Sequence, residues 1–315
     1  MRYIEYHLPT KRLLNEDLEN IFPDFTATKI SEKVGISSRC ISSENEFAVD
    51  LGIEASRKLI LKNGIDSQSI DFLIFCTQSP DNTLPSGSAV IQNSLNLKKS
   101  LGSIDINQGC SGYIYGLFLA SSILKSGHYK NILLVTADTY TKYITENDKS
   151  NRSIFGDGAS ATLINKRNLN FLDFSLGTDG SGSKNLVAFN SCLKKNSSFS
   201  TPELYMNGTE IFNFTIKNVP SLVRNILDKN SLEINDIDLF IFHQANKFML
   251  NHLRKKIGIP DEKFLIDMED TGNTVSSSIP IVISKHFERF EKSKRILLCG
   301  FGVGYSWGAC IIDNN

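Results

Sequence analysis

The sequence predicts an α/β protein built from two similar halves, because the same strand and helix patterns recur in one order. The apolar run at residues 70–75, IDFLIF, returns almost unchanged at residues 237–242, IDLFIF, an offset of 167. A second run at residues 132–135 has its counterpart at residues 296–298, an offset of 164. Short apolar runs of this kind are typical of strands buried on both faces of a sheet.

A helix-length segment rich in small and apolar residues precedes the second strand of each half. These segments occupy residues 110–125 and 273–287, an offset of 163. Each half then ends on a strand that small residues open, at residues 159–164 and 308–312. Strands that alternate with helices twice over predict two βαβ halves related by a pseudo-twofold axis.

The repeat divides the chain into an N-terminal half, residues 1–166, and a C-terminal half, residues 167–315. At 315 residues and 41% hydrophobic content, the chain is long and apolar enough to bury a large core. Residues 179–202 are rich in Ser, Asn, Gly and Lys, and we interpret them as a surface loop.

The balance of charge excludes several classes of function. Lys+Arg and Asp+Glu both number 34, so no excess charge attracts the protein to nucleic acid or to an anionic membrane. The first residues lack the basic and then apolar pattern of a signal peptide, and no run reaches the roughly 18 apolar residues of a membrane span. We therefore expect a cytoplasmic protein without nucleic-acid or membrane partners.

The cysteines predict neither a zinc site nor a disulfide framework, and we expect no metal. No two of them form a CxxC pair, and the five histidines do not cluster with them. The six are Cys40, Cys76, Cys110, Cys192, Cys299 and Cys310.

Cys110 differs from the other cysteines in its setting. It follows a predicted strand at residues 103–106 and opens the predicted helix that starts there. The positive end of a helix lowers the pKa of a thiol, and Gly109 and Gly112 permit a tight turn and close approach of a substrate. This pattern indicates a nucleophile. The alternative is a small buried cysteine that packs the start of a helix.

His243 and Asn273 are predicted to meet Cys110 at one site. His243 ends a predicted strand, at the sheet edge where α/β proteins usually bind ligands. Asn273 heads the helix that pairs with the Cys110 helix, and the pseudo-twofold axis brings the two helix starts together. The alternatives are a structural histidine and an asparagine that caps a helix.

The chain resembles the β-ketoacyl-acyl carrier protein synthase III enzymes of the thiolase-like superfamily over nearly its whole length. The resemblance implies a thiolase-like fold, with the two halves packed as a five-layered αβαβα core. The Cys-His-Asn set is that of this family, whereas elongating synthases have Cys-His-His and thiolases have a second cysteine. The matching motifs are Cys110, His243-Gln-Ala-Asn246, Gly272-Asn273-Thr274, Phe155-Gly-Asp-Gly-Ala159, Met206-Asn-Gly-Thr-Glu-Ile-Phe212 and Gly300-Phe-Gly-Val-Gly-Tyr-Ser-Trp-Gly308.

The resemblance implies a two-stage reaction in lipid metabolism, as in fatty acid biosynthesis. Cys110 first takes an acyl primer from a thioester, with the backbone N–H of Cys110 and one N–H of the 302–304 loop stabilising the oxyanion. His243 and Asn273 then donate hydrogen bonds to a malonyl thioester that loses carbon dioxide and attacks the primer. Acyl thioesters of coenzyme A (CoA) or acyl carrier protein are the substrates, and no cofactor is implied.

The resemblance also implies a homodimer and two sets of binding residues. The implied substrate-binding residues are Leu84, Asn246, Phe301, Gly302, Val303 and Gly304. A small basic face on the helix after Asn246 is implied to meet the carrier protein, or else is only a solvated helix face. Its residues are Lys247, Arg254, Lys255 and Lys256.

Four positions depart from the family pattern. The Trp and Arg that clamp the adenine of CoA in the best-known members are Lys29 and Lys149 here. Phe248 takes the place of an Arg that meets the carrier protein. Leu84, before Pro85, stands where the partner subunit closes the acyl pocket, and it leaves more room than an aromatic residue.

Two other functions remain open from the sequence. An acyltransferase of the same fold would move the Cys110 acyl group to a hydroxyl or amine without decarboxylation, and the altered donor contacts keep that reading open. A catalytically silent paralogue could serve as a binding subunit, although the intact Cys-His-Asn set argues against it.

Overall fold

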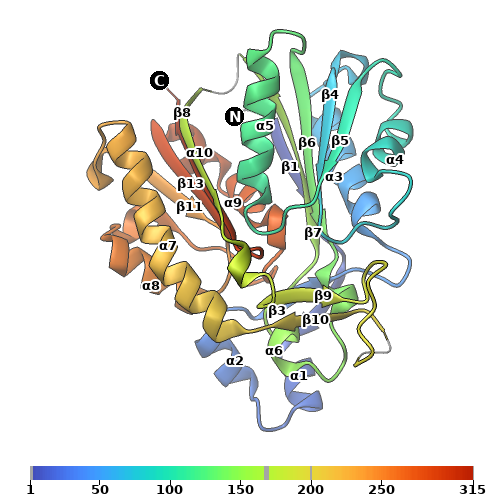
Figure 1. The fold of residues 1–315 in the computed structure, drawn as a ribbon, viewed down its shortest axis with the longest axis vertical. Helices are drawn as coiled ribbons and strands as arrows, with labels where there is room; N and C mark the ends of the chain where they lie inside the picture. The colour runs from blue at the N-terminus through green and yellow to red at the C-terminus, as the bar shows by residue number, and fades with distance from the viewer. Residues whose placement is uncertain (1–2, 167–169, 199–200, 315) are drawn as a thin grey trace.

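Two five-stranded sheets stand side by side in the protein, with helices between and outside them (Figure 1). The computed structural model describes residues 3–166, 170–198 and 201–314. In the first sheet the strands lie in the order β1 (Tyr3–His7), β7 (Gly158–Asn165), β6 (Asn131–Asp138), β4 (Phe72–Cys76) and β5 (Gly102–Ile106). In the second the order is β8 (Phe171–Thr178), β14 (Ser306–Asp313), β13 (Arg295–Gly302), β11 (Leu239–Phe242) and β12 (Phe264–Leu265).

The two sheets have the same topology, which confirms the predicted duplication. In each sheet the first two pairings are antiparallel and the last two are parallel. The repeated run IDFLIF contributes β4, and its counterpart IDLFIF contributes β11 at the same place in the order. All of β11 and nearly all of β4 are buried, as expected for parallel strands covered on both faces.

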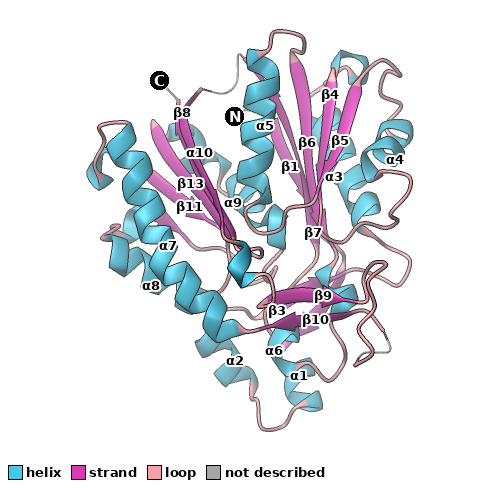
Figure 2. Ribbon diagram, in the orientation of Figure 1, coloured by secondary structure: helices cyan, strands magenta, loops and turns pink. Residues whose placement is uncertain are grey.

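The helices complete a five-layered αβαβα core, as predicted (Figures 1 and 2). The central layer is α5 (Gly112–Lys125) and α9 (Ser278–Lys285), which contact strands of both sheets. Helix α3 (Ala48–Lys62) covers the outer face of the first sheet, and α7 (Gly208–Lys229) covers that of the second. The other helices are α1 (Asn15–Ile21), α2 (Ala27–Val34), α4 (Gly87–Ser94), α6 (Lys149–Arg152), α8 (Lys247–Ile257) and α10 (Phe287–Lys292).

Helix α5 is apolar around most of its circumference because it lies between the two sheets. Tyr113, Ile114 and Leu117 are fully buried, whereas Phe118 and Ser122 lie on its exposed side. Gly116 lets α5 approach β6 closely, since a Cβ at this position would lie 2.6 Å from Leu134 Cδ1. This central layer sets the distance between the two sheets, and therefore between the two halves of the site. The division of the chain after residue 166 remains a prediction.

Two small antiparallel sheets of two strands each lie at the end of the molecule where the site is built (Figure 1). Strands β2 (Lys11–Leu14) and β3 (Ser38–Ile41) form one, and β9 (Leu186–Phe189) and β10 (Glu203–Met206) form the other. The interpretation of residues 179–202 as a plain loop is therefore wrong for β9, whose short apolar run packs inward at Leu186. Residues 199 and 200 of that segment lie outside the described residues.

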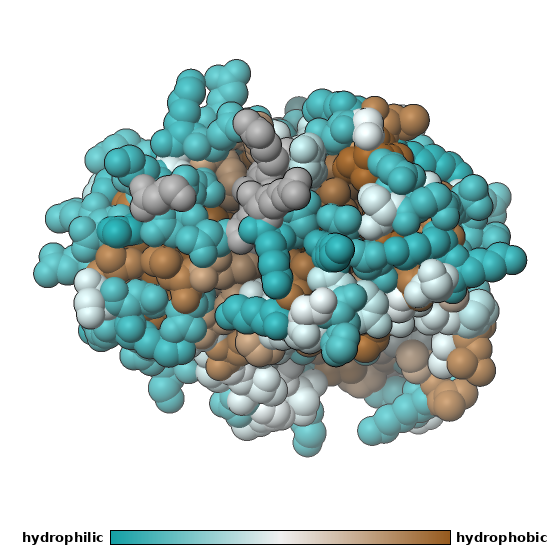
Figure 3. Space-filling view, turned by 90° about the horizontal axis from the view of Figure 1, so that it is seen from above, coloured by the Kyte–Doolittle hydropathy of each residue, from teal (hydrophilic) through white to brown (hydrophobic). Residues whose placement is uncertain are grey.

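The described residues contain no helix long and apolar enough to cross a membrane. Within the same residues, no group of three or more His, Cys, Asp or Glu side chains is arranged to hold a metal ion. The face seen from above is mostly hydrophilic, with apolar residues in separate patches (Figure 3).

Candidate active site

Cys110, His243 and Asn273 line one cavity of about 110 Å³, as the sequence predicts. Cys110 comes from the first half, and the other two come from the second. The three are almost completely buried. The rest of the wall is mainly apolar and includes Ile154, Phe155, Leu186, Met206, Ile211 and Met249.

The turn that carries Cys110 lies between β5 and α5 and packs directly on β13. A Cβ at Gly302 would lie 3.0 Å from Cys110 Sγ, and a Cβ at Gly300 would lie 2.7 Å from the Cys110 carbonyl oxygen. These close approaches explain why glycine occupies both positions of the strand. Helix α5 begins at Gly112, two residues later than the sequence suggested.

Two backbone N–H groups, those of Cys110 and Val303, donate hydrogen bonds to the Cys110 sulfur. They favour the thiolate, but burial outweighs them and raises the pKa of the thiol to about 12, with Asp138 adding to the rise. The expectation of a lowered pKa is therefore wrong for the free enzyme. Desolvation in a closed, mainly apolar cavity disfavours the charged form more than the turn stabilises it.

His243 is held as a neutral imidazole. Its backbone N–H continues the sheet by donating to the Cys299 carbonyl at 2.8 Å. Burial lowers the pKa of His243 to about 3, and a backbone hydrogen bond with Val275 only partly opposes this. The ring is therefore uncharged near neutral pH.

Ser278 holds one ring nitrogen of His243. Nδ1 lies 2.7 Å from Ser278 Oγ, which also accepts a hydrogen bond from the Gln244 backbone N–H at 3.3 Å. A hydroxyl can donate to Nδ1 as well as accept from it. When Ser278 donates, the ring proton is on Nε2 and His243 is a hydrogen-bond donor toward the cavity.

Asn273 is fixed by the first half of the chain. Its backbone N–H donates to Ile154 O at 2.9 Å, and its carbonyl accepts from the Gly156 N–H at 3.0 Å. The side-chain Oδ1 accepts from the Val275 N–H at 2.9 Å, which leaves the NH₂ group for the cavity. Because α9 begins only at Ser278, the interpretation of Asn273 as its cap is wrong.

The segment after Asn273 is strained and is held by buried hydrogen bonds. Val275 has a φ of +51°, a conformation that β-branched residues rarely adopt and that persists only where neighbours fix it. Ser276 Oγ donates to Asp138 Oδ2 at 2.5 Å, and Ser277 Oγ lies 2.8 Å from Thr136 Oγ1. Burial raises the pKa of Asp138 to about 7, although the bonds from Ser276 oppose this rise.

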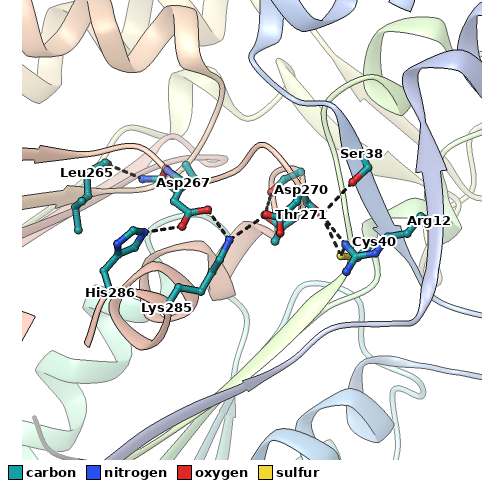
Figure 4. A network of polar contacts seen from close by, with 11 residues as sticks. Arg12, Ser38, Cys40, Leu265, Asp267, Asp270, Thr271, Lys285 and His286 are labelled. Atoms are coloured by element: carbon teal, nitrogen blue, oxygen red, sulfur yellow. Dashed lines mark hydrogen bonds and ion pairs between the residues drawn. The ribbon is translucent and has the colours of Figure 1, made fainter. Parts of the chain in front are cut away.

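The segment before Asn273 is held by a polar network between the two halves (Figure 4). Lys285 Nζ contacts Asp267 Oδ1 at 2.5 Å and Asp270 Oδ1 at 3.0 Å. The Asp270 carbonyl accepts from Arg12 Nη1 at 2.5 Å and from Ser38 Oγ at 3.2 Å. These contacts, with the serine contacts above, fix Asn273 from both sides.

The residues implied to bind substrate divide into three groups. Asn246, Phe301 and Gly302 line the cavity, and the Asn246 side chain also caps α8 by accepting from the Met249 N–H at 2.8 Å. Val303 and Gly304 follow in the adjoining loop, where Val303 reaches the Cys110 sulfur. Leu84 does not line the cavity of its own chain and is 85% exposed.

The predicted basic face on α8 is only partly free. Lys247, Lys255 and Lys256 are exposed, whereas Arg254 Nε lies 3.1 Å from Asp261 Oδ1 at the end of the helix. Arg254 is therefore engaged within the chain. Phe248, also on this helix, is 60% exposed.

Neither position of the adenine clamp offers a stacking pair. Lys149 Nζ contacts Asp24 Oδ2 at 3.0 Å and lies 5.4 Å from the centre of the Phe25 ring. Lys29 is exposed on α2.

The comparison with known proteins identifies the family. A family model described as 3-oxoacyl-[acyl-carrier-protein (ACP)] synthase III matches residues 104–180, and its C-terminal model matches residues 227–313. The β-ketoacyl-[acyl-carrier-protein] synthase III of Streptococcus uberis is 35% identical over 98% of this chain and 96% of its own length. The chain belongs to the synthase III family.

Solved structures agree with this identification. A crystal structure of a 3-oxoacyl-(acyl-carrier-protein) synthase III superposes with a TM-score of 0.93 at 39% identity, covering 99% of this chain and 98% of that one. A priming β-ketosynthase from a polyketide pathway gives a TM-score of 0.88 at 26% identity, covering 99% and 96%. The resemblance stated from the sequence and the thiolase-like fold are both confirmed. The chain is a condensing enzyme of the transferase class.

Sequence reasoning missed several residues of the site. Leu186 lies in a segment of loop composition, which gave no sign of a buried strand. Ser278 contacts the His243 ring, and Asp138 raises the pKa of Cys110, so neither residue is recognisable from its own sequence position. The only sequence signal for Ser278 is its place in the run of three serines that follows Asn273. Thr215 also lines the cavity, on α7, and no pattern singled it out.

Proposed function

We propose that this enzyme loads an acyl primer on Cys110 and condenses it with a malonyl thioester to give a 3-oxoacyl thioester. The observation that carries the proposal is the meeting of three groups in one cavity: a thiol with two backbone donors at its sulfur, an imidazole, and a carboxamide whose NH₂ group is free. Acyl thioesters of CoA or acyl carrier protein are the substrates, without a further cofactor. The cytoplasm is the proposed compartment.

In the first stage, Cys110 Sγ attacks the carbonyl carbon of an acyl thioester. The carbonyl oxygen gains negative charge, and the N–H groups of Cys110 and Val303 are placed to stabilise it as an oxyanion hole. Collapse of this intermediate breaks the bond to the departing sulfur. The proton of the Cys110 thiol finally resides on that departing thiol, so loading releases no net proton.

In the second stage, a malonyl thioester binds with its carbonyl oxygen toward His243 Nε2–H and Asn273 Nδ2–H. The bond to the carboxylate breaks, carbon dioxide leaves, and the electron pair forms an enolate that the two donors stabilise. The enolate carbon attacks the acyl carbonyl on Cys110, and the Cys110 thiolate leaves and takes a proton from water. His243 suits this step because it is neutral, with its Nδ1 engaged by Ser278.

Leu84 supports a homodimer in which each subunit completes the acyl pocket of the other. Strand β5 lies at the edge of its sheet, where unpaired backbone groups favour pairing with another chain. Ile104 on this strand, Val90 on the neighbouring α4 and Leu84 are exposed apolar residues. We propose that this edge is the dimer interface.

Leu84→Phe should shift the enzyme toward short primers. The native protein should load primers longer than acetyl faster than acetyl, because leucine leaves room in the pocket. The larger ring should slow the longer primers by roughly tenfold, since overfilling a packed site costs about 1–3 kcal/mol. The measurement is the initial rate of Cys110 loading against chain length, with Leu61→Phe on the exposed face of α3 as control. If the native protein loads acetyl faster than longer primers, and Leu84→Phe does not change the loading rates, the assignment of Leu84 to the acyl pocket is wrong.

Carrier-bound acyl groups should load Cys110 faster than the same groups on CoA. A stacked cation–π contact is worth about 0.5–2 kcal/mol, and neither Lys29 nor Lys149 supplies one for adenine. The expected difference is several-fold in loading rate, measured by intact-mass spectrometry with matched donors. Lys29→Trp combined with Lys149→Arg should restore the clamp and narrow the gap. Equal rates for the two donors in the native protein would refute this prediction.

The alternative reaction passes the Cys110 acyl group to an alcohol or amine without decarboxylation. It needs the thiol and the oxyanion hole, but it has no use for two further N–H donors at a malonyl carbonyl. The free NH₂ group of Asn273 therefore favours condensation, which also requires the His243 tautomer with its proton on Nε2.

A further inference from the structure

One polar side chain of the cavity wall is buried without a partner. Thr215 lies on α7, is fully buried and lines the same cavity as Cys110. Its hydroxyl oxygen has no hydrogen-bond partner within the part of the chain that the structure describes. A buried hydroxyl that forms no hydrogen bond destabilises a folded protein. We therefore expect that the Thr215 hydroxyl has a function that offsets this loss of stability.

The helix offers the hydroxyl an ordinary partner that it does not use. A threonine inside a helix commonly donates to the carbonyl four residues earlier, which here belongs to Ile211. No such bond is formed. Gly208, Ile211 and Thr215 instead follow one face of α7 along the cavity wall. Thr215 therefore lies on the face of α7 that lines the cavity.

Each of the other polar side chains of the wall has one atom engaged within the protein. Asn246 Oδ1 accepts from the α8 backbone, Asn273 Oδ1 accepts from Val275, and His243 Nδ1 contacts Ser278. Most of the remaining wall residues carry no polar side-chain atom. Thr215 is thus positioned for a hydrogen bond with a bound molecule, in surroundings where such a bond is strong because water is excluded.

We propose that the Thr215 hydroxyl binds an amide of the pantetheine arm that carries acyl groups to Cys110. This inference rests on the proposed function, in which thioesters of CoA or carrier protein enter the cavity, and both donors share this arm. An amide presents an N–H donor and a carbonyl acceptor, and a hydroxyl both donates and accepts. The arm therefore supplies the partner that the free protein lacks, and Thr215 determines specificity for the arm, whichever donor carries it.

Thr215→Val tests the proposal, because it removes the hydroxyl at nearly constant volume. The probes are S-butyryl-pantetheine and S-butyryl-2-mercaptoethanol, which lacks the amides, and the readout is kcat/KM for loading of Cys110. We expect Thr215→Val to lower kcat/KM about tenfold for the pantetheine thioester and to leave the mercaptoethanol thioester unchanged. Thr215→Ser, which keeps the hydroxyl, should retain most of the native value.

The melting temperature of the free protein supplies a second readout. Thr215→Val should raise it, because the native hydroxyl is buried and unpaired. Thr162→Val is the matched control, since Thr162 is equally buried but its hydroxyl lies 3.2 Å from the Tyr113 hydroxyl, away from the cavity. This control should lower the melting temperature and leave kcat/KM unchanged. A fall for Thr215→Val as well would mean that its hydroxyl is paired within the protein, and would overturn the proposal.

The outcomes separate this proposal from the proposed function. If the native protein loads neither thioester, nor any acyl carrier protein donor, the proposed function fails. If it loads both and Thr215→Val slows both equally, the hydroxyl does not contact the arm and only this inference fails. An effect that appears with S-3-hydroxybutyryl-pantetheine and not with S-butyryl-pantetheine would assign the hydroxyl to the acyl chain, which also overturns it.

Discussion

Asn273→Ala should still load Cys110 with an acyl group but release carbon dioxide from a malonyl thioester about 10²–10³-fold more slowly. Loss of one donor to a developing oxyanion typically has an effect of this size, and decarboxylation places that charge on the malonyl carbonyl oxygen. Loading does not use this donor, because the oxyanion of the first stage faces the N–H groups of Cys110 and Val303. The assay follows labelled carbon dioxide beside the mass of the loaded protein.

His243→Ala should resemble Asn273→Ala in the second stage, since it removes the other donor. Thr28→Val, on the exposed surface of α2, is a control that should change neither stage. If Asn273→Ala slows loading and decarboxylation by the same factor, the carboxamide maintains the structure of the cavity and does not donate a hydrogen bond to the malonyl carbonyl oxygen. That result would remove Asn273 from the proposed mechanism.

Cys110→Ala should abolish acyl loading completely, because no other described cysteine faces the cavity. Intact-mass spectrometry after incubation with an acyl donor should show only the unmodified protein. Cys192→Ser is the matched control, since Cys192 is the exposed cysteine and should be dispensable. An acyl adduct that persists in Cys110→Ala and disappears in Cys192→Ser would show that the exposed Cys192 is the nucleophile.

The sequence predicts the architecture well because the strands are buried on both faces. Such strands appear as short apolar runs, and their repetition at a nearly fixed offset establishes two sheets of equal topology. The β9–β10 hairpin was not predicted, because β9 is short and lies within a segment of loop composition. A four-residue strand at a surface has too few residues to show a period of two.

The sequence predicts that Cys110, His243 and Asn273 meet, but it does not predict the electrostatics of the cavity that they line. Cys110, His243 and Asn273 each follow or open an element, so their position at the sheet edges could be inferred. The pKa of Cys110 could not, because it depends on burial by the second half of the chain and on Asp138, 28 residues away in sequence. Ser278 and Thr215 likewise acquire their importance only from what folding places beside them.

The most direct test of the account is the release of labelled carbon dioxide from malonyl carrier protein by the acyl-loaded native enzyme. Condensation predicts one carbon dioxide for each acyl group that leaves Cys110, together with a 3-oxoacyl product on the carrier. The contrary result is a loaded enzyme that decarboxylates no malonyl donor, yet passes its acyl group to an alcohol or amine.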